Sequence, residues 1–162
     1  MIDKNLLDLS RQINSLARDN KIRISTTESC TGGLVASCLT SIEGASNYFD
    51  YGFITYSNEA KITMLGVDPK ILDQFGAVSE EVAISMALGA LRISKSSISI
   101  AITGIAGPSG GSRFKPVGTV CFAVASKVNT ESYVRKFIGD RQIIRYKACE
   151  EALSFLLKIL GK

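Results

Sequence analysis

Apolar residues recur along the chain with two different periods, and these periods predict an alternation of helices and strands. Asp3 is placed to cap a helix over residues 3–19, in which leucine and isoleucine side chains form one stripe at helical spacing. Residues 22–26, 48–56 and 97–103 are runs of β-branched, aromatic or small side chains, which are typical of strands. The run at 97–103 has no charged side chain, so it predicts a central strand buried on both faces.

The rest of the pattern predicts further helices and one hairpin. Capping and turn residues bound expected helices at 34–41, at 59–65, from Asp68–Pro69 to Gly76, from Ser79 onward, and from Asp140 to about Leu160. Expected strands at 118–126 and 132–138 are joined by so short a link that they predict an antiparallel hairpin. Helices between most of the strands predict an α/β fold, with helices on both faces of one mixed sheet.

Length and composition are those of one soluble domain over residues 1–162. Hydrophobic residues make up 46% of the chain and charged residues 21%, and no apolar run is long enough to span a membrane. The amino terminus lacks the basic start and apolar run of a signal peptide, so we expect a cytoplasmic protein without a membrane partner. The net charge is +4, but its 19 Lys and Arg are dispersed, which does not indicate a nucleic-acid partner. Attraction of a small anionic substrate explains this charge equally well.

The cysteine and histidine content narrows the possible chemistry. The chain has four cysteines and no C-x-x-C pair, so we expect free thiols rather than a zinc site. It has no histidine, which excludes Ser-His-Asp and Cys-His catalysis and histidine-ligated metals. The carboxylates are scattered, and we predict neither a metal nor a cofactor. A catalytic base would therefore have to be Lys, Asp, Glu or Tyr.

The stretch from Ser25 to Gly33 joins an expected strand to an expected helix and has two interpretations. Small polar residues and a glycine pair before a helix are typical of loops that place reactive groups at a helix N-terminus. Ser29 would then be a nucleophile close to unpaired backbone N–H groups. Alternatively, Ser29 and Thr31 cap the helix. Cys30 is a rival nucleophile, disfavoured by its apolar context and by the lack of a histidine partner.

Lys61, Arg141 and the loop 104–112 also have two interpretations each. Lys61 falls in the first turn of its helix, where a cation is electrostatically unfavourable; it is either an exposed lysine or a buried neutral base. Arg141 begins the last helix, where it is either a surface arginine or an anion ligand. The loop follows the expected central strand and is either a flexible surface loop or part of a ligand site.

Six stretches in order resemble the CinA C-terminal domain family, also called the competence/damage-inducible protein C-terminal domain. The resemblance runs from about residue 5 to residue 160, and its stretches are 27–33, 52–61, 76–80, 103–108, 115–120 and 139–141. The loop around Ala45 differs from the Gly-Ser-Ser of many members, and Ser109 stands at a variable position. This chain resembles the stand-alone form, without the additional N-terminal domain of larger relatives.

The resemblance implies a fold, an activity and a set of site residues. It implies a three-layer α/β/α sandwich with a mixed, mostly parallel sheet, which self-associates as a homodimer or higher homo-oligomer. It also implies an amidase that converts nicotinamide mononucleotide to nicotinate mononucleotide and ammonia. By similarity Ser29 is the nucleophile and Lys61 its base, with Ser46 and Tyr56 as auxiliary polar groups.

The remaining expected site residues bind the substrate. N–H groups near Thr31, Gly32 and Gly33 are expected to hold the oxyanion. The loop 104–112, with Gly104 and Gly107, and Arg141 are expected near the phosphate, and Thr103 is expected to bind the substrate. Tyr56 either orients Lys61 or Ser29 or is a strand aromatic with its hydroxyl in solvent. Two other functions stay open: a non-catalytic nucleotide-binding or regulatory module, and direct DNA binding, which rests on the +4 charge alone.

Overall fold

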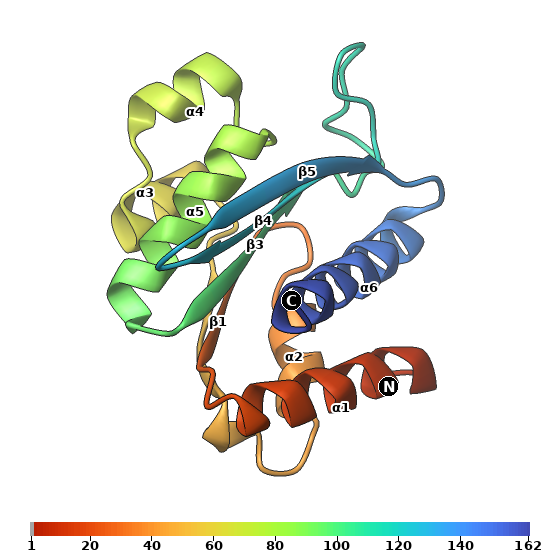
Figure 1. Ribbon diagram of the computed structural model, residues 1–162. Helices are drawn as coiled ribbons and strands as arrows, with labels where there is room; N and C mark the ends of the chain where they lie inside the picture. Colours follow the sequence, from red (N-terminus) through yellow and green to blue (C-terminus); the bar gives the residue numbers. More distant parts are fainter. Residues whose placement is uncertain (1) are drawn as a thin grey trace.

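The computed structural model describes residues 2–162, and it contains one five-stranded sheet with helices against both faces (Figure 1). None of the helices described in this range is both long and apolar enough to cross a membrane. In chain order the elements are α1 (Lys4–Asp19), β1 (Ile24–Glu28), α2 (Leu34–Thr40), the 3₁₀ turn η1 (Ala45–Asn47), β2 (Phe49–Ile54), α3 (Asn58–Leu65), α4 (Pro69–Phe75), α5 (Glu80–Ser94), β3 (Ile98–Gly104), β4 (Thr119–Ser126), β5 (Thr130–Lys136) and α6 (Arg141–Leu160).

The sheet is mixed, as predicted, and its strand order is β2-β1-β3-β4-β5. β1 pairs in parallel with both β2 and β3, whereas β4 pairs antiparallel with both β3 and β5. Four strands therefore share one direction and β4 runs against them. The β4–β5 hairpin and the fully buried course of residues 98–103 in β3 were both predicted and are confirmed.

Two apolar cores, one on each face of the sheet, make the fold a three-layer sandwich. Ile100 and Ile102 of β3 belong to the core with α1, α2 and α6, whereas Ala101 between them belongs to the core with α3, α4 and α5. Figure 1 shows these two groups of helices on opposite faces of the sheet. Successive strand side chains point to opposite faces, so β3 contributes to both cores. Its buried position places its carboxyl end, and that of its neighbour β1, at the centre of one edge of the domain.

β1 begins two residues later than the predicted strand at 22–26. Ile22 N–H donates to the carbonyl of Ala17 at 2.7 Å, and Lys21 has a positive φ of 55°, so this segment completes the end of α1. The shift matters for the site because Glu28 becomes the last residue of β1 and Ser29 follows it directly.

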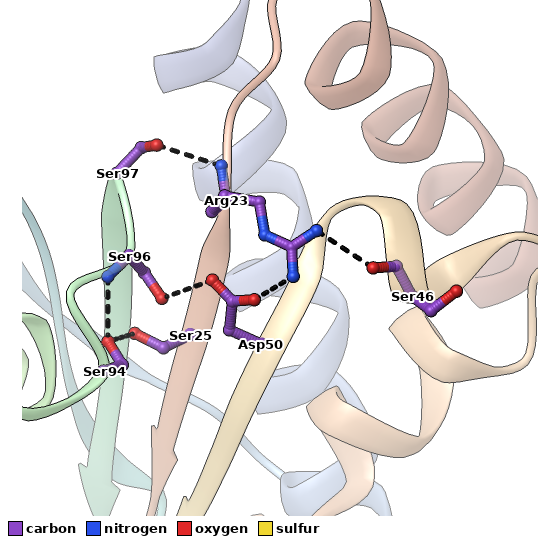
Figure 2. A network of polar contacts seen from close by, with 7 residues as sticks. All are labelled: Arg23, Ser25, Ser46, Asp50, Ser94, Ser96 and Ser97. Carbon is purple, nitrogen blue, oxygen red and sulfur yellow. Dashed lines mark hydrogen bonds and ion pairs between the residues drawn. The ribbon is translucent and has the colours of Figure 1, made fainter.

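A network of hydrogen bonds and one ion pair connects the amino ends of β1, β2 and β3 (Figure 2). Arg23 forms an ion pair with Asp50 and donates to the carbonyl of Ser46 at 2.9 Å. The second carboxylate oxygen of Asp50 accepts from the hydroxyl of Ser96 at 3.2 Å. We call this set the Arg23–Asp50 network; its members are Arg23, Ser25, Ser46, Asp50, Ser94, Ser96 and Ser97.

Candidate active site

Ser29 lies at the carboxyl end of β1, where the chain leaves the sheet. Its N–H still donates to the carbonyl of Ile102 in β3, at 2.9 Å, so the neighbouring strand fixes its backbone. The chain then turns through Gly32 and Gly33, whose φ angles of 60° and 93° are in the left-handed region that favours glycine. Gly32 N–H closes the turn on the carbonyl of Ser29 at 3.0 Å. The sequence therefore places Ser29 on a rigid strand-to-helix turn, with only 8% of its surface exposed.

The cap of α2 is the Glu28 side chain, and the predicted capping role of Thr31 is wrong. The buried Glu28 carboxylate accepts from the N–H groups of Gly33, Val35 and Ala36 at 2.9, 3.1 and 2.8 Å. The Thr31 hydroxyl is buried and has no hydrogen-bond partner among residues 2–162. An anion at a helix N-terminus compensates the partial positive charge there, so Glu28 satisfies the start of α2 from inside the protein.

Lys61 reaches Ser29 from α3. Ser57 caps α3 through its hydroxyl, which accepts from Ala60 N–H at 3.0 Å, and Lys61 follows in the next position. The lysine side chain points back toward the start of its helix, as helical side chains do. Its Nζ lies 3.3 Å from Ser29 Oγ, and only 1% of the residue is exposed. The predicted proximity of the two residues is confirmed.

Burial shifts Lys61 toward its neutral form. Burial lowers the pKa of Lys61 below its ordinary value of 10.5. No carboxylate of the described residues 2–162 forms an ion pair with it. Nζ lies 2.9, 3.4 and 3.5 Å from the carbonyl oxygens of Thr55, Tyr56 and Ser57. A neutral amine has two N–H donors for such carbonyls and one lone pair, and the lone pair is then left for the Ser29 hydroxyl.

A cleft of about 270 Å³ opens above this pair. Its lining includes Ser29 and Lys61 together with other residues that the sequence singled out, namely Tyr56, Thr103, Gly104, Gly107 and Arg141. The Thr103 hydroxyl donates to the carbonyl of Ala77 at 2.7 Å, so it ties β3 to the segment before α5. The loop after β3 forms one wall of this cleft.

Arg141 joins the two walls of the cleft. It is the first residue of α6, which Asp140 caps. Its guanidinium donates to the carbonyl of Gly107 at 2.8 Å and to the Tyr56 hydroxyl at 2.7 Å. The Tyr56 hydroxyl thus points to Arg141, neither to Lys61 nor only to solvent, and it is the Tyr56 carbonyl that lies near Lys61. The arginine is exposed on the cleft side and holds a positive charge at its mouth.

Ser46 does not belong to this site, and the auxiliary role expected for it is not compatible with the fold. It is exposed on η1 and belongs to the Arg23–Asp50 network at the amino ends of the strands (Figure 2). Six residues of extended chain from Arg23 to Ser29 correspond to roughly 20 Å. The physical reason is topological: α2 carries the chain back to the amino end of the sheet before the parallel strand β2 begins.

The expected oxyanion donors are only partly free. The N–H of Gly32 is bound to the Ser29 carbonyl, and that of Gly33 is bound to Glu28, so the expectation for these two glycines is wrong. None of Thr31, Gly32 and Gly33 lines the cleft itself. The N–H groups of Cys30 and Thr31, by contrast, donate to no main-chain or side-chain acceptor elsewhere within residues 2–162. Burial raises the pKa of the Cys30 thiol to about 12, which keeps it protonated at neutral pH and disfavours it as a nucleophile.

Sequence reasoning missed three residues of this region. Asn58, at the start of α3, lines the cleft. Glu28 caps α2, and its signal was a carboxylate directly before the reactive turn. Arg145 of α6 donates to the carbonyls of Cys30 and Thr31, a contact between residues more than one hundred positions apart that no local pattern contains.

The fold and the site together define a class: a three-layer α/β/α domain with a buried serine–lysine pair at the carboxyl end of its central strands. A family profile described as the CinA C-terminal domain matches residues 6–160. The chain therefore belongs to the CinA C-terminal domain family.

Relatives of two sizes match the chain. The nicotinamide-nucleotide amidohydrolase PncC of Escherichia coli K12 is 47% identical over 158 residues, which cover 96% of this chain and 95% of the relative. A CinA-like protein of Syntrophobacter fumaroxidans is 47% identical over 152 residues, but this chain spans only 36% of its length. The crystal structure of a competence/damage-inducible protein from Agrobacterium tumefaciens has a TM-score of 0.95, at 41% identity, and covers 100% of this chain and 99% of that one.

Proposed function

We propose that the protein is a nicotinamide-nucleotide amidase, which hydrolyses nicotinamide mononucleotide to nicotinate mononucleotide and ammonia with Ser29 as nucleophile and Lys61 as base. The observation that carries the proposal is the 3.3 Å contact between a nearly buried hydroxyl and a buried amine without a carboxylate partner in residues 2–162. The name of the E. coli relative, which matches over nearly its whole length, supports the substrate.

The first half-reaction forms an acyl-enzyme. Neutral Lys61 takes the hydroxyl proton of Ser29 as Oγ attacks the carboxamide carbon of the nicotinamide group. The carbonyl oxygen becomes an oxyanion, and the N–H groups of Cys30 and Thr31, which donate to no main-chain acceptor in residues 2–162, are its proposed donors. The tetrahedral intermediate collapses, the C–N bond breaks, and the ammonium of Lys61 returns the proton to the departing ammonia.

The second half-reaction releases the acid. Lys61, neutral again, takes a proton from water, and the resulting hydroxide attacks the acyl carbon. The ester bond to Ser29 breaks, Lys61 protonates Oγ, and nicotinate mononucleotide leaves. All proton transfers in this scheme use the single Nζ, whose position is fixed by the carbonyls of Thr55, Tyr56 and Ser57.

Recognition of the nucleotide phosphate falls to the mouth of the cleft. Arg141 contributes the positive charge there. Gly104 and Gly107 also line the cleft, and they let the loop pack closely against Val120 and Val117, where a Cβ would lie 2.8 and 2.6 Å from those side chains. The α2 N-terminus is not available for the phosphate because Glu28 occupies it. We further propose a cytoplasmic homodimer or higher homo-oligomer, which sedimentation analysis of the purified protein would test.

Ammonia release from nicotinamide mononucleotide tests the proposal. The wild-type protein is expected to release ammonia stoichiometrically with nicotinate mononucleotide, and Ser29→Ala is expected to lower the rate by at least about 10³-fold. Ser46→Ala is the matched control and should retain the wild-type rate, since that hydroxyl lies at the other end of the sheet. Full activity in Ser29→Ala would refute the nucleophile. Nucleotide binding in calorimetry without any ammonia release would instead support the non-catalytic module.

A further inference from the structure

Arg145 of α6 contacts the turn that carries Ser29 and does not line the cleft. Its Nε donates to the carbonyl of Cys30 at 3.1 Å and its Nη2 donates to the carbonyl of Thr31 at 2.8 Å. Arginine side chains more often bind carboxylates in two-point contacts, yet no carboxylate within residues 2–162 forms an ion pair with Arg145. The guanidinium is thus directed at two successive peptide groups next to the candidate nucleophile.

The orientation of these two peptide groups follows from their planarity. Both are trans, since the only cis peptide bond described is Gly107–Pro108, and in a trans peptide the C=O and N–H bonds point in opposite directions. With both carbonyls turned to Arg145, the N–H groups of Thr31 and Gly32 point away from it. Gly32 N–H is bound to the Ser29 carbonyl, whereas Thr31 N–H finds no acceptor in the described part of the chain.

We propose that Arg145 is a positioning residue for the chemistry at Ser29, because it holds the turn and polarises the Cys30–Thr31 peptide group, whose N–H is one of the two proposed oxyanion donors. This inference rests on the proposed hydrolytic function. A cation bound to a carbonyl oxygen makes the N–H of the same peptide a stronger donor, since hydrogen bonds in a chain polarise one another. The arginine acts through the main chain and does not contact the substrate.

Two further observations support a role beyond holding α6 against the turn. Burial and the charge of Glu28 raise the pKa of the Cys30 thiol, and the charge of Arg145 offsets part of that rise. The guanidinium also lies close to the turn at Gly32, where a Cβ would be 3.4 Å from Nη2. A field that favours negative charge at Cys30 also favours it at an oxyanion beside Ser29.

The test compares Arg145→Met and Arg145→Ala with Lys147→Met, which removes one positive charge from the same helix without touching the turn. Steady-state rates with nicotinamide mononucleotide give kcat and KM. The rate at which a fluorophosphonate probe labels Ser29 measures the reactivity of the nucleophile and the stabilisation of the oxyanion, and it does not depend on that substrate. Arg145→Met is expected to lower both kcat and the labelling rate by about 10²-fold, with KM within threefold. Lys147→Met should stay within twofold of the wild type in all three.

Chemical rescue separates positioning from simple loss of structure. Methylguanidinium is expected to restore at least tenfold of the lost kcat in Arg145→Ala and nothing in Ser29→Ala, while circular dichroism reports the fold of each variant. Unchanged kcat and labelling in Arg145→Met would overturn the inference, as would a loss confined to KM, or a loss in a folded variant that methylguanidinium does not reverse.

Failure of the proposed function has a different signature. Wild-type protein that is labelled at Ser29 but releases no ammonia would refute the substrate and leave the labelling comparison to decide the role of Arg145. Wild-type protein that is neither labelled nor active would overturn the inference, since there would be no nucleophile to serve.

Discussion

A cationic side chain lies at each end of the central strands, and the two side chains differ in burial and in their partners. At the amino ends, Arg23 is paired with Asp50 and partly exposed, with 40% of its side-chain surface accessible. At the carboxyl ends, Lys61 is 1% exposed and has carbonyl and hydroxyl oxygens but no carboxylate around it in the described residues. Asp50 raises the pKa of Arg23 through a hydrogen bond, whereas burial lowers the pKa of Lys61.

This difference separates a structural role from a chemical one. A cation next to a carboxylate keeps its proton and contributes to stability, so it has no reason to react. A buried amine without such a partner is held closer to deprotonation, and a hydroxyl within 3.3 Å then has a base beside it. Both the Arg23–Asp50 network and the surroundings of Lys61 are hydrogen-bonded. The cluster around Lys61 differs in that its cation has no carboxylate partner within the described chain, and this difference indicates the reactive site.

The largest expected effect is the loss of activity when Lys61 is removed, compared with the removal of Arg23. Lys61→Met should lower kcat/KM for nicotinamide mononucleotide by about 10³-fold, because it removes the base while filling the same volume. Arg23→Met should leave kcat/KM within about threefold of the wild type. Ammonia release by both purified variants, with folding checked by circular dichroism, makes the measurement. Equal losses in the two variants would remove the proposed distinction between the ends.

The next largest effect is expected in the pH dependence of activity, which should depend on Lys61 and not on Arg23. Lys61 must be neutral to act as a base, so kcat/KM should rise about tenfold per pH unit below its lowered pKa and then level off. Arg23→Met should show the same profile as the wild type, because Arg23 does not titrate in this range. Initial rates between pH 5 and 9 give the curve. A flat wild-type curve would argue against lysine as the base.

Substitutions in the Arg23–Asp50 network at the amino ends of the strands should change the stability of the fold rather than its activity. Asp50→Ala removes the partner of Arg23 and the acceptor of the buried Ser96 hydroxyl, so it is expected to lower the unfolding free energy by about 1–2 kcal/mol. The activity of the folded protein should not change. Asp8→Ala is the control, since Asp8 pairs with Arg11 on the exposed surface of α1 and should alter stability by less than about 0.5 kcal/mol. Urea unfolding would measure both, and equal values would contradict the assignment.

The smallest expected effect is a pH-dependent stability difference at Lys61. Its pKa is lower in the folded chain than the 10.5 of an exposed lysine, so between these values the unfolded chain binds a proton that the folded chain does not. The wild-type unfolding free energy should therefore rise with pH in this window relative to that of Lys61→Met, by on the order of 1 kcal/mol. Parallel urea titrations at pH 7 and pH 10 test the sign. A difference that does not change with pH would mean that Lys61 titrates normally.

The fold could be predicted from the sequence because its strands and helices are made of local apolar patterns. The run at 97–103 contains only residues that tolerate burial on both sides, and it forms the central strand β3. Ser29 and Lys61 could be identified because the lack of histidine left few possible pairs, and the family resemblance selected this one. Their distance of 3.3 Å is a tertiary fact that no pattern supplies.

The errors arose where a contact crosses elements. Glu28 would be an ordinary strand end by pattern, yet its carboxylate reaches across the turn to three N–H groups of α2. Capping rules favour a serine or threonine hydroxyl close to the start of a helix, and they therefore pointed to Thr31. Ser46 was carried over by resemblance, but the path of α2 returns it to the opposite end of the sheet.

The Glu28 cap has a consequence for anyone who wishes to transplant this turn into another scaffold. Residues 28–36 carry their own internal anchor, since the carboxylate and the three N–H groups that it binds all lie within that segment. A graft of these nine residues should therefore keep the capped start of α2. It would lose the contacts with Ile102 and Arg145 that hold the turn from outside the segment. It would also lack Lys61, so we expect it to be inert.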